Sequence, residues 1–260
     1  MIDALLDLPA HVRECLASAL EFGILPGVPS EVALRSTLGT TTPIEGVAKA
    51  LAELARLGVN GPAAAAWLRS FAAAEARAPR PDLVWSGPEV SGLHARDTRR
   101  VYEELLGSAE RSLWVSTYAF FDGPRAFEVL ARRMDVAPSL LVTLLLNIQR
   151  KRGDTTAAEH LVRRFADRFW SAEWPGTSCP RVFYDPRTLD LDAPGGVLHA
   201  KAVIADDEAV FVTSANLTEA ALERNIELGL LVRDRALAAS VSAHFRGLID
   251  RGLLSPLPGK

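Results

Sequence analysis

A run that is apolar at all positions but Thr143, "LLVTLLL" at residues 140–146, is the feature that most restricts the fold of this chain. A strand that is apolar on both of its faces is buried on both, which requires a sheet with helices packed on each side. Segments with the apolar spacing of amphipathic helices lie before and after this run, at 124–134 and 156–170. The sequence therefore predicts an α/β fold in which helices sandwich the sheet.

The same alternation of strands and helices continues through most of the chain. Predicted strands lie at 83–90, 112–120, 140–148, 181–185, 197–205, 209–216 and 226–232, and two more helices lie at 97–109 and 235–250. Only "DDE" separates 197–205 from 209–216, which is short enough for a β-hairpin. The sheet is therefore predicted to be mixed rather than wholly parallel.

The first 76 residues are predicted to form a separate helical domain. Apolar residues recur every three or four positions in four segments, 10–23, 30–39, 43–58 and 61–76. Basic residues are sparse there, so we interpret the domain as a packing or partner-docking module rather than a helix-turn-helix that contacts DNA. Proline and charge concentrate at 75–83, which predicts a linker, and the second domain is expected to span 83–260.

Composition argues against several classes of protein. The net charge is −3, so a polyanion would have to be held by local clusters rather than by the overall field. The N-terminus carries acidic residues where a secretory signal needs basic ones, and no run is long enough to cross a bilayer. The two cysteines, Cys15 and Cys179, do not have the spacing of zinc ligands. We expect a cytoplasmic protein that binds neither membrane nor structural metal.

Polar residues with a set spacing surround the predicted hairpin. They are His199, Lys201, Asp206, Ser214, Asn216 and Glu227. Strand residues i and i+2 share one face of a sheet, so His199 and Lys201 are expected to point the same way, while the alanines beside them point the other way. One face of this strand is thus predicted to be apolar and the other to carry chemistry.

This spacing resembles the HKD motif of the phospholipase D superfamily, His-x-Lys-x4-Asp-x6-Gly-Ser-x-Asn. Only the glycine departs, because Thr213 stands in its place. An accidental match to the other five positions has a chance on the order of one in ten thousand in a chain of this size. Residues 83–253 resemble a single domain of that superfamily, and Glu227 lies where many members keep an acid that orients the histidine.

The resemblance implies phosphodiester chemistry without a metal or other cofactor. A neutral imidazole is nucleophilic near neutral pH, so His199 is expected to attack phosphorus and form a phosphohistidine. Lys201 and the Asn216 amide would hold nonbridging oxygens as charge builds on them. Glu227 would fix the imidazole tautomer. Asp206 is expected to brace the loop and Lys201, and Ser214 either donates to phosphate or caps the turn.

The sequence contains no second His-x-Lys pair. The superfamily mechanism needs a second histidine to protonate the leaving oxygen, and the other histidines lack a lysine partner; they are His11, His94, His160 and His244. Single-motif members pair two chains about a twofold axis. We therefore expect a homodimer with one composite active site, its axis passing through the sheet edge near "HAKAVIAD".

Basic residues near the predicted strand ends suggest nucleic acid as the substrate. The segment "QRKR" follows a buried strand directly, at the sheet edge where ligands of α/β proteins bind, so Arg150, Lys151 and Arg152 are expected to contact DNA. Further basic stretches lie at 94–100 and 162–164. The aromatic side chains of Trp170, Trp174 and Tyr184 are expected mainly in the core, with base stacking as the alternative.

The order of a short helical region and one such domain resembles the phospholipase-D-like DrmC component of the DISARM anti-phage defence system. That resemblance implies a bacterial nuclease with other defence-system subunits as possible partners. Two alternatives stay open. One is a phospholipase D acting on lipid headgroups, against which the Ala-rich helices argue, since an interfacial helix needs bulky apolar residues. The other is a catalytically weak DNA-binding or scaffold subunit.

Overall fold

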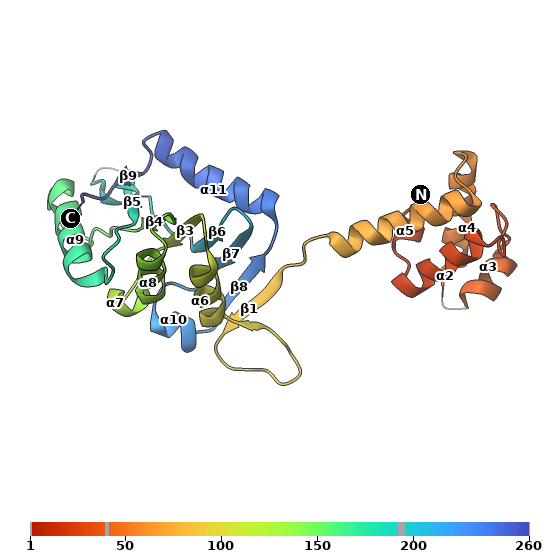
Figure 1. Ribbon diagram of the computed structural model, residues 1–260, viewed down its shortest axis with the longest axis horizontal. Helices are drawn as coiled ribbons and strands as arrows, with labels where there is room; N and C mark the ends of the chain where they lie inside the picture. The colour runs from red at the N-terminus through yellow and green to blue at the C-terminus, as the bar shows by residue number, and fades with distance from the viewer. Residues whose placement is uncertain (1, 40–41, 192–195, 260) are drawn as a thin grey trace. The chain divides into compact units, whose positions relative to one another are not determined.

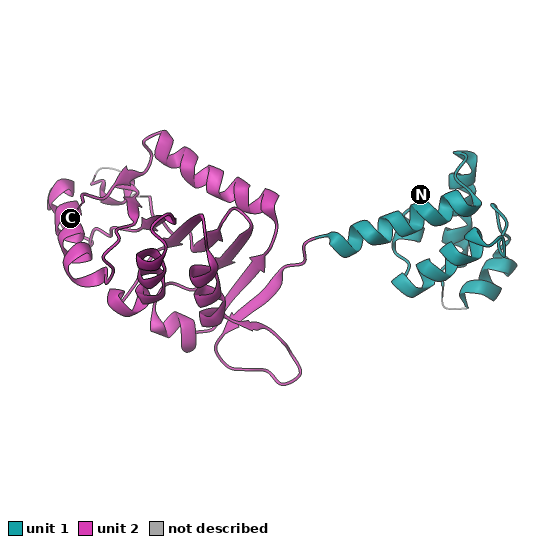
Figure 2. Ribbon diagram, in the orientation of Figure 1, with its two compact units in different colours: residues 1–78 teal, residues 79–260 magenta. Residues whose placement is uncertain are grey.

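The computed structural model describes residues 2–39, 42–191 and 196–259. The chain divides into two compact units, Met1–Ala78 and Pro79–Lys260, which Figure 2 colours separately. Helix α5 continues to Arg77 and the first strand begins at Asp82, so the segment between them is shorter than the linker predicted at 75–83.

The N-terminal unit is entirely helical in its described residues. Its helices are α1 (Asp3–Leu6), α2 (Ala10–Glu21), α3 (Glu31–Leu38), α4 (Ile44–Arg56) and α5 (Gly61–Arg77). The four predicted helices are all present, and the Ser30 hydroxyl caps α3 by accepting a hydrogen bond from the backbone N–H of Ala33. Helix α1 was not predicted, because four residues are too few to display helical periodicity.

A buried arginine ties the first helices of this unit to the last one. Arg13 on α2 is only 4% exposed. Its guanidinium donates a hydrogen bond of 2.8 Å to the Glu75 carboxylate and one of 2.9 Å to the Leu8 carbonyl. The same group lies 5.0 Å from the centre of the Phe71 ring. Because a buried charge is costly unless it is paired and hydrogen-bonded, these contacts account for its position inside the unit.

The C-terminal unit is built on a mixed sheet, as predicted. Within the described residues the sheet has nine strands in the order β2-β1-β8-β7-β6-β3-β4-β5-β9 (Figure 1). Their bounds are β1 (Asp82–Ser86), β2 (Arg96–Asp97), β3 (Ser112–Thr117), β4 (Leu141–Leu146), β5 (Arg181–Tyr184), β6 (Ala202–Ala205), β7 (Ala209–Thr213), β8 (Glu227–Val232) and β9 (Ser255–Pro256). Strands β3, β4 and β5 run parallel, whereas β6 is antiparallel to both β3 and β7. The predicted hairpin is the β6–β7 pair.

Helices cover both faces of this sheet (Figure 1). The helical segments are α6 (Thr98–Ser108), α7 (Gly123–Ala126), α8 (Glu128–Val136), α9 (Ala158–Arg168), a π-helical turn (Phe169–Glu173), a 3-10 turn (Pro186–Leu189), α10 (Glu219–Glu223) and α11 (Arg235–Asp250). The main core lies between the sheet and α6, α8 and α9, while α11 packs on Trp114, Ile204 and Val210 of the opposite face. The helix predicted at 124–134 is divided into α7 and α8 at Phe127, whose side chain is buried.

Helix α11 leaves one row of its sheet face uncovered. Val210 and Val232 pair across β7 and β8 and lie in the cluster beneath α11. The next row toward the start of β8 is Val212, Leu230 and Leu83, which are paired neighbours on three strands and are 51%, 46% and 46% exposed. Leu228 continues this apolar face at 52% exposure. We call these four side chains the uncovered sheet face.

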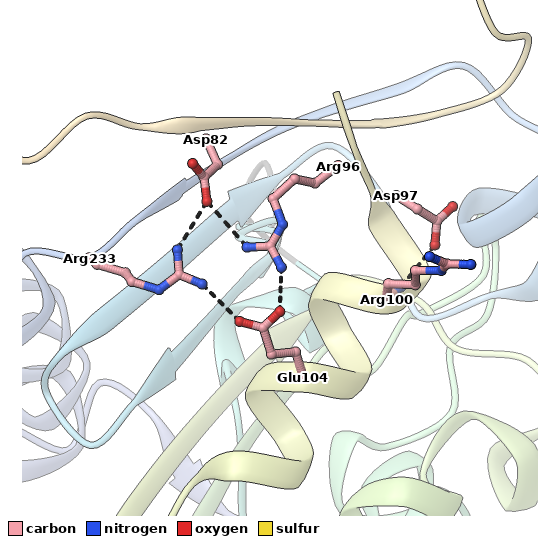
Figure 3. Close-up of polar contacts among 6 residues, drawn as sticks. All are labelled: Asp82, Arg96, Asp97, Arg100, Glu104 and Arg233. Carbon is pink, nitrogen blue, oxygen red and sulfur yellow. Dashed lines mark hydrogen bonds and ion pairs between the residues drawn. The ribbon is translucent and has the colours of Figure 1, made fainter. Parts of the chain in front are cut away.

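A closed ring of four charged side chains secures the β1 side of the sheet (Figure 3). Asp82 pairs with Arg96 at 3.2 Å and with Arg233 at 3.0 Å, and Glu104 pairs with Arg233 at 2.8 Å and also with Arg96. The ring thus links β1, β2, α6 and the residue after β8. It supports the β1–β8 pairing, in which Ser86 lies opposite Glu227.

Candidate active site at one sheet edge

Antiparallel pairing brings the candidate residues to one edge of the sheet. His199 and Lys201 precede β6, and Glu227 begins β8. Ser214 and Asn216 follow β7, which runs the opposite way between those two strands. The ends of β3 and β4 meet the same edge, since β3 is antiparallel to β6 and parallel to β4. Five of the six predicted catalytic residues therefore lie at this edge, and Asp206 does not.

His199 and Lys201 contact each other just outside the strand on which they were predicted. Strand β6 begins at Ala202, although the ladder continues one step further through a 3.1 Å hydrogen bond from Thr213 N to Lys201 O. The Lys201 ammonium lies 3.1 Å from Nδ1 and 3.3 Å from Nε2 of His199, and it donates 3.0 Å to the His199 carbonyl. An ammonium can only donate, so it can bond only a ring nitrogen that carries no hydrogen.

The two side chains differ in their exposure to solvent. His199 is exposed, whereas Lys201 is only 7% exposed. Burial lowers the pKa of Lys201 from its ordinary value near 10.5, and the negative charge of Glu227 opposes part of that shift. The site thus places an accessible imidazole over a buried cation.

Strand β6 lies in the interior of the sheet, so a twofold axis near "HAKAVIAD" cannot run along the side of this strand. It is the fifth of nine strands and pairs with β3 on one side and β7 on the other. Both flanks of its backbone are hydrogen-bonded and closed to a second chain. An axis that brings two copies of His199 together has to pass beyond the strand ends.

A tight turn after β7 presents Ser214 and Asn216. Thr213, which stands where the HKD pattern has glycine, accepts a 3.0 Å hydrogen bond from Ala215 N through its hydroxyl. Its φ angle is not in the left-handed region, so the turn does not require glycine there. The side-chain oxygen Oδ1 of Asn216 accepts from Ala119 N at 3.2 Å, which joins this turn to the loop after β3. Its amide nitrogen donates no hydrogen bond to any described residue.

Glu227 bonds its neighbours rather than the histidine. One carboxylate oxygen accepts from the Ser214 hydroxyl, and the other accepts from the Asn225 amide at 3.2 Å. The Ser214 hydroxyl also accepts from Leu228 N at 3.1 Å. Among the described residues no hydrogen bond joins Glu227 to His199, so the expected orientation of the ring by this acid is not observed. The carboxylate instead acts on Lys201 through its charge.

Asp206 lies at the opposite end of β6, so it does not brace Lys201 as predicted, although it does brace a loop. Four residues of extended chain lie between the two, and the five steps along it span about 16 Å at roughly 3.3 Å per residue. Its carboxylate accepts from the backbone N–H groups of Glu110, Arg111 and Ser112 at 2.9, 2.7 and 2.9 Å. Burial raises its pKa, but these three bonds outweigh burial and hold the pKa below 3.8. Asp206 therefore braces the start of β3.

Two site residues were missed from the sequence, Tyr118 after β3 and Asn147 after β4. The Tyr118 ring packs against the His199 ring with 4.8 Å between centroids, and Lys201 Nζ lies 5.7 Å from the same ring. Asn147 carries a buried side-chain oxygen without a hydrogen-bond donor among the described residues. Both directly follow buried strands whose ends meet the site, which was the available signal.

The basic loop after β4 contains one structural arginine and two cations, Lys151 and Arg152, whose side chains make no hydrogen bond or ion pair with a described residue; we call these two the free cations. The Arg150 guanidinium donates to three backbone carbonyls, those of Leu189, Asp154 and Thr156, at 2.6–3.0 Å. Arg150 was predicted to contact DNA. Its guanidinium donors are instead occupied by backbone carbonyls of this loop and of the loop after β5. Lys151 and Arg152 are exposed.

The aromatic residues considered for base stacking serve other contacts. Trp170 and Trp174 are 8% and 6% exposed and belong to the main core, as expected. Tyr184 is partly buried and packs against the same core. None of the three lines the cleft described below.

An open cleft of about 690 Å³ lies beside Tyr118, whose ring packs against the His199 ring. His199 itself does not line the cleft, and the other walls come from the loops after β4 and β5, including Gly196 and Val197. Across the described ranges, no three His, Cys, Asp or Glu side chains lie close enough to hold a metal ion. No helix in those ranges is long and apolar enough to span a bilayer.

A mixed sheet between helices, with His-x-Lys before its central strand and Ser-x-Asn after the adjacent strand, defines a phospholipase-D-like domain. The family model described as "Cardiolipin synthase, PLD-like domain" matches residues 102–249. The chain belongs to this family. Cardiolipin synthase A of Pseudomonas entomophila is 26% identical over 148 residues, which cover 57% of this chain and 27% of that protein. The matched segment thus spans about a quarter of that relative's length.

Three solved structures are similar to this chain at low identity. Nuc from Salmonella typhimurium, a phospholipase D family member, is 19% identical with a TM-score of 0.43 and matches over 68% of this chain and 97% of its own. NucT from Helicobacter pylori is 18% identical with a TM-score of 0.41, over 58% and 87% of the two chains. Phosphatidylserine synthase of Haemophilus influenzae is 18% identical with a TM-score of 0.47, over 74% and 46%.

Proposed function

We propose that this protein is a phosphodiesterase that cleaves DNA through a covalent phosphohistidine. The observation that carries the proposal is the contact between the exposed His199 ring and the ammonium of the buried Lys201, at the sheet edge that also holds Asn216 and Glu227. A nucleophile beside a fixed cation is the arrangement that phosphoryl transfer needs, because negative charge builds on the phosphoryl oxygens.

In the first step a ring nitrogen of His199 attacks phosphorus. A P–N bond forms, the P–O bond to the leaving group breaks, and the leaving oxygen takes a proton from a general acid. In the second step water attacks phosphorus and transfers its proton to that same group. The P–N bond then breaks and returns the electron pair to His199. Lys201 and the Asn216 amide nitrogen are the proposed donors to the nonbridging oxygens, so no metal is required in this scheme.

We assign the general acid to His199 of a second copy of the chain. The sequence has one His-x-Lys pair and the reaction needs two histidines at one phosphorus. An isologous dimer supplies the second histidine by symmetry. The uncovered sheet face supports this assembly, because it is apolar, borders Ser214 and Glu227, and would be buried by a second copy.

DNA is the proposed substrate because Lys151 and Arg152 stand free beside the cleft that adjoins His199. Phosphate contacts from such side chains supply most nonspecific affinity for nucleic acid. In the cell we place the protein in the cytoplasm as the nuclease of a DISARM-type defence system, an assignment that rests on domain order and length. The alternative within such a system is a DNA-binding or scaffold subunit with at most weak catalytic activity.

A second candidate is phosphatidyl transfer to or from a lipid headgroup. It is favoured by the name of the relative, cardiolipin synthase A, and uses the same histidine chemistry with an alcohol in place of water. The half-exposed leucines of the uncovered sheet face would then meet lipid rather than a second copy.

One set of assays separates these readings. The full chain and its His199→Asn variant are compared on bis-p-nitrophenyl phosphate, on labelled single-stranded and duplex DNA, and on phospholipid vesicles, all in EDTA. We expect DNA cleavage that EDTA does not inhibit and that falls at least about 10³-fold in the variant. Equal activity of the variant would refute the nucleophile, and lipid turnover without DNA cleavage would favour the second candidate. An unchanged melting temperature confirms that the variant is folded, as the exposure of His199 predicts.

A further inference from the structure

The cleft beside His199 has the size and lining of a site for a small organic group. Its volume of about 690 Å³ lies within the ~300–1,000 Å³ of typical small-molecule sites. The phosphodiester chemistry proposed above concerns only the edge where His199 and Lys201 lie. The cleft lies at the same end of the sheet, between the loops after β4 and β5, so it would receive what is attached to the phosphate.

Tyr118 forms the part of the cleft nearest the reacting group. Its ring packs on the His199 ring at 4.8 Å between centroids and also lines the cleft. A planar group in the cleft that stacks on the Tyr118 ring would therefore be separated from the reacting phosphorus by the Tyr118 and His199 side chains alone. Aromatic rings bind nucleobases in this way without selecting among them.

Asn147 adds a hydrogen-bond acceptor that has no donor. Its side-chain oxygen is buried and unpartnered among the described residues, although most buried polar atoms in proteins are paired. It lines the same cleft as Tyr118, with Gln149 two residues further along. Every nucleobase carries an N–H donor on its Watson–Crick edge, and such a donor could pair with the Asn147 oxygen.

The charges around the cleft are arranged for a phosphate backbone at its rim. Lys151 and Arg152 are exposed, whereas the Arg150 guanidinium is held by carbonyls. Two acidic residues, Asp154 and Asp190, also line the cleft. The Asp154 carboxylate accepts from Thr156 N at 2.9 Å and lies 4.0 Å from Arg164. Diacyl chains in this cleft would place hydrocarbon against two cations and leave the Asn147 oxygen unpaired.

We infer that this cleft binds one unpaired nucleobase of a single-stranded nucleic acid, stacked on Tyr118 and hydrogen-bonded to Asn147, with the adjacent phosphate at His199. Only an unpaired base can enter, since a base in a duplex has both faces stacked and its Watson–Crick edge occupied. The inference rests on the proposed function for the position of the phosphate, and it adds the substrate class: single strands rather than duplex.

Binding to the His199→Asn full chain tests the inference apart from catalysis. The probe is a fluorescently labelled eight-nucleotide single strand, compared by anisotropy with the same strand made wholly of abasic residues. We expect the abasic strand to bind about 5- to 150-fold more weakly, the range for loss of one base–aromatic stack. Equal affinity of the two strands would overturn the inference.

Two substitutions made in this background locate the base. Tyr118→Leu should remove most of the difference between the two strands by weakening only the base-containing one. Phe121→Leu is the matched control, because Phe121 lies in the same loop and is 72% exposed but does not line the cleft. An equal effect of both substitutions would assign the stacking to another place and overturn the role of Tyr118.

Asn147→Ala separates a ligand contact from a structural one. If the Asn147 oxygen accepts a hydrogen bond from a bound base, its removal should weaken binding of the base-containing strand. It should not lower the melting temperature, because the substitution removes a buried polar atom that has no partner among the described residues of the unbound protein. A lower melting temperature with unchanged binding would contradict this.

The inference and the proposed function can fail separately. If the wild-type chain cleaves bis-p-nitrophenyl phosphate but its binding does not depend on the bases, the inference fails and the proposed function stands. If base-dependent binding occurs without cleavage, the inference stands and the proposed function fails.

Discussion

The Glu227 carboxylate accepts a hydrogen bond from the Ser214 hydroxyl, which joins the first residue of β8 to the residue that follows β7. The same hydroxyl accepts from Leu228 N, so Ser214 is engaged in holding two strand ends together. Burial lowers the pKa of Lys201, and the charge of Glu227 partly opposes that effect. At this site the acid is thus coupled to Lys201, the proposed phosphate ligand, rather than to His199, the proposed nucleophile.

The alkaline limit of activity should report the state of Lys201. The ammonium form is required, and because its pKa is below 10.5 in the folded protein, activity should fall with rising pH before that value. Glu227→Gln removes the charge that opposes the shift, so the limb of kcat/KM against pH should move to still lower pH. Ser214→Ala is the control, since it removes the hydrogen bond but keeps the charge. A limb that stays in place in Glu227→Gln would mean that another group sets it.

Asp206 should matter for stability and not for turnover. Asp206→Asn puts an amide against one of three N–H donors and should cost about 1–3 kcal/mol of unfolding free energy at pH 7. The folded pKa of Asp206 is below 3.8, so its ionised form contributes stability above that pH and loses it as pH falls through the lowered value. The difference between the two proteins in urea denaturation should therefore shrink at low pH.

The matched control for Asp206 is Asp207→Asn. Asp207 has nearly the same left-handed backbone, φ 55° against 56°, but among the described residues its carboxylate accepts a single side-chain hydrogen bond, from Ser242. An asparagine can still accept that bond, so the loss should be smaller. A large fall in kcat of properly folded Asp206→Asn would restore the catalytic role that its position in the sheet argues against.

The two free cations beside the cleft should govern the salt dependence of DNA binding. Replacing Lys151 and Arg152 by alanine should weaken binding of single strands and reduce the slope of log affinity against log salt by about 0.7 per residue. The control is Arg246→Ala with Arg251→Ala, which removes the same charge from exposed positions. Equal slopes for the two double variants would show that overall charge, not this loop, holds the strand.

The composite site should be visible in mixing experiments. Because both copies of His199 act on one phosphorus, heterodimers of wild type and His199→Ala should be inactive, and activity should fall as the square of the wild-type fraction once chains exchange. Leu230→Glu on the uncovered sheet face should give monomers by sedimentation and lose activity with them. A linear fall, or a monomer that turns over normally, would mean that each chain holds a complete site.

The sequence by itself determined the local structure of this protein. Apolar runs such as 140–146 identified buried strands, the "DDE" linkage identified the β6–β7 hairpin, and the apolar spacing at 30–39 identified α3. The same spacing placed His199 near Lys201, since neighbours two apart on extended chain share a face. All of these depend on contacts within a few residues, which periodicity and capping specify directly.

Only the tertiary structure decided which distant residues meet. Asp206 belongs to the sequence motif, yet strand direction carries it to the far end of β6, where it binds the backbone of residues 110–112. Tyr118 is 81 residues from His199 and Asn147 is 52 residues away, and they reach the site because β3 and β4 end where β6 begins. The physical reason is that strand order and direction follow from burying the whole sheet between its helices, which no short stretch of sequence records.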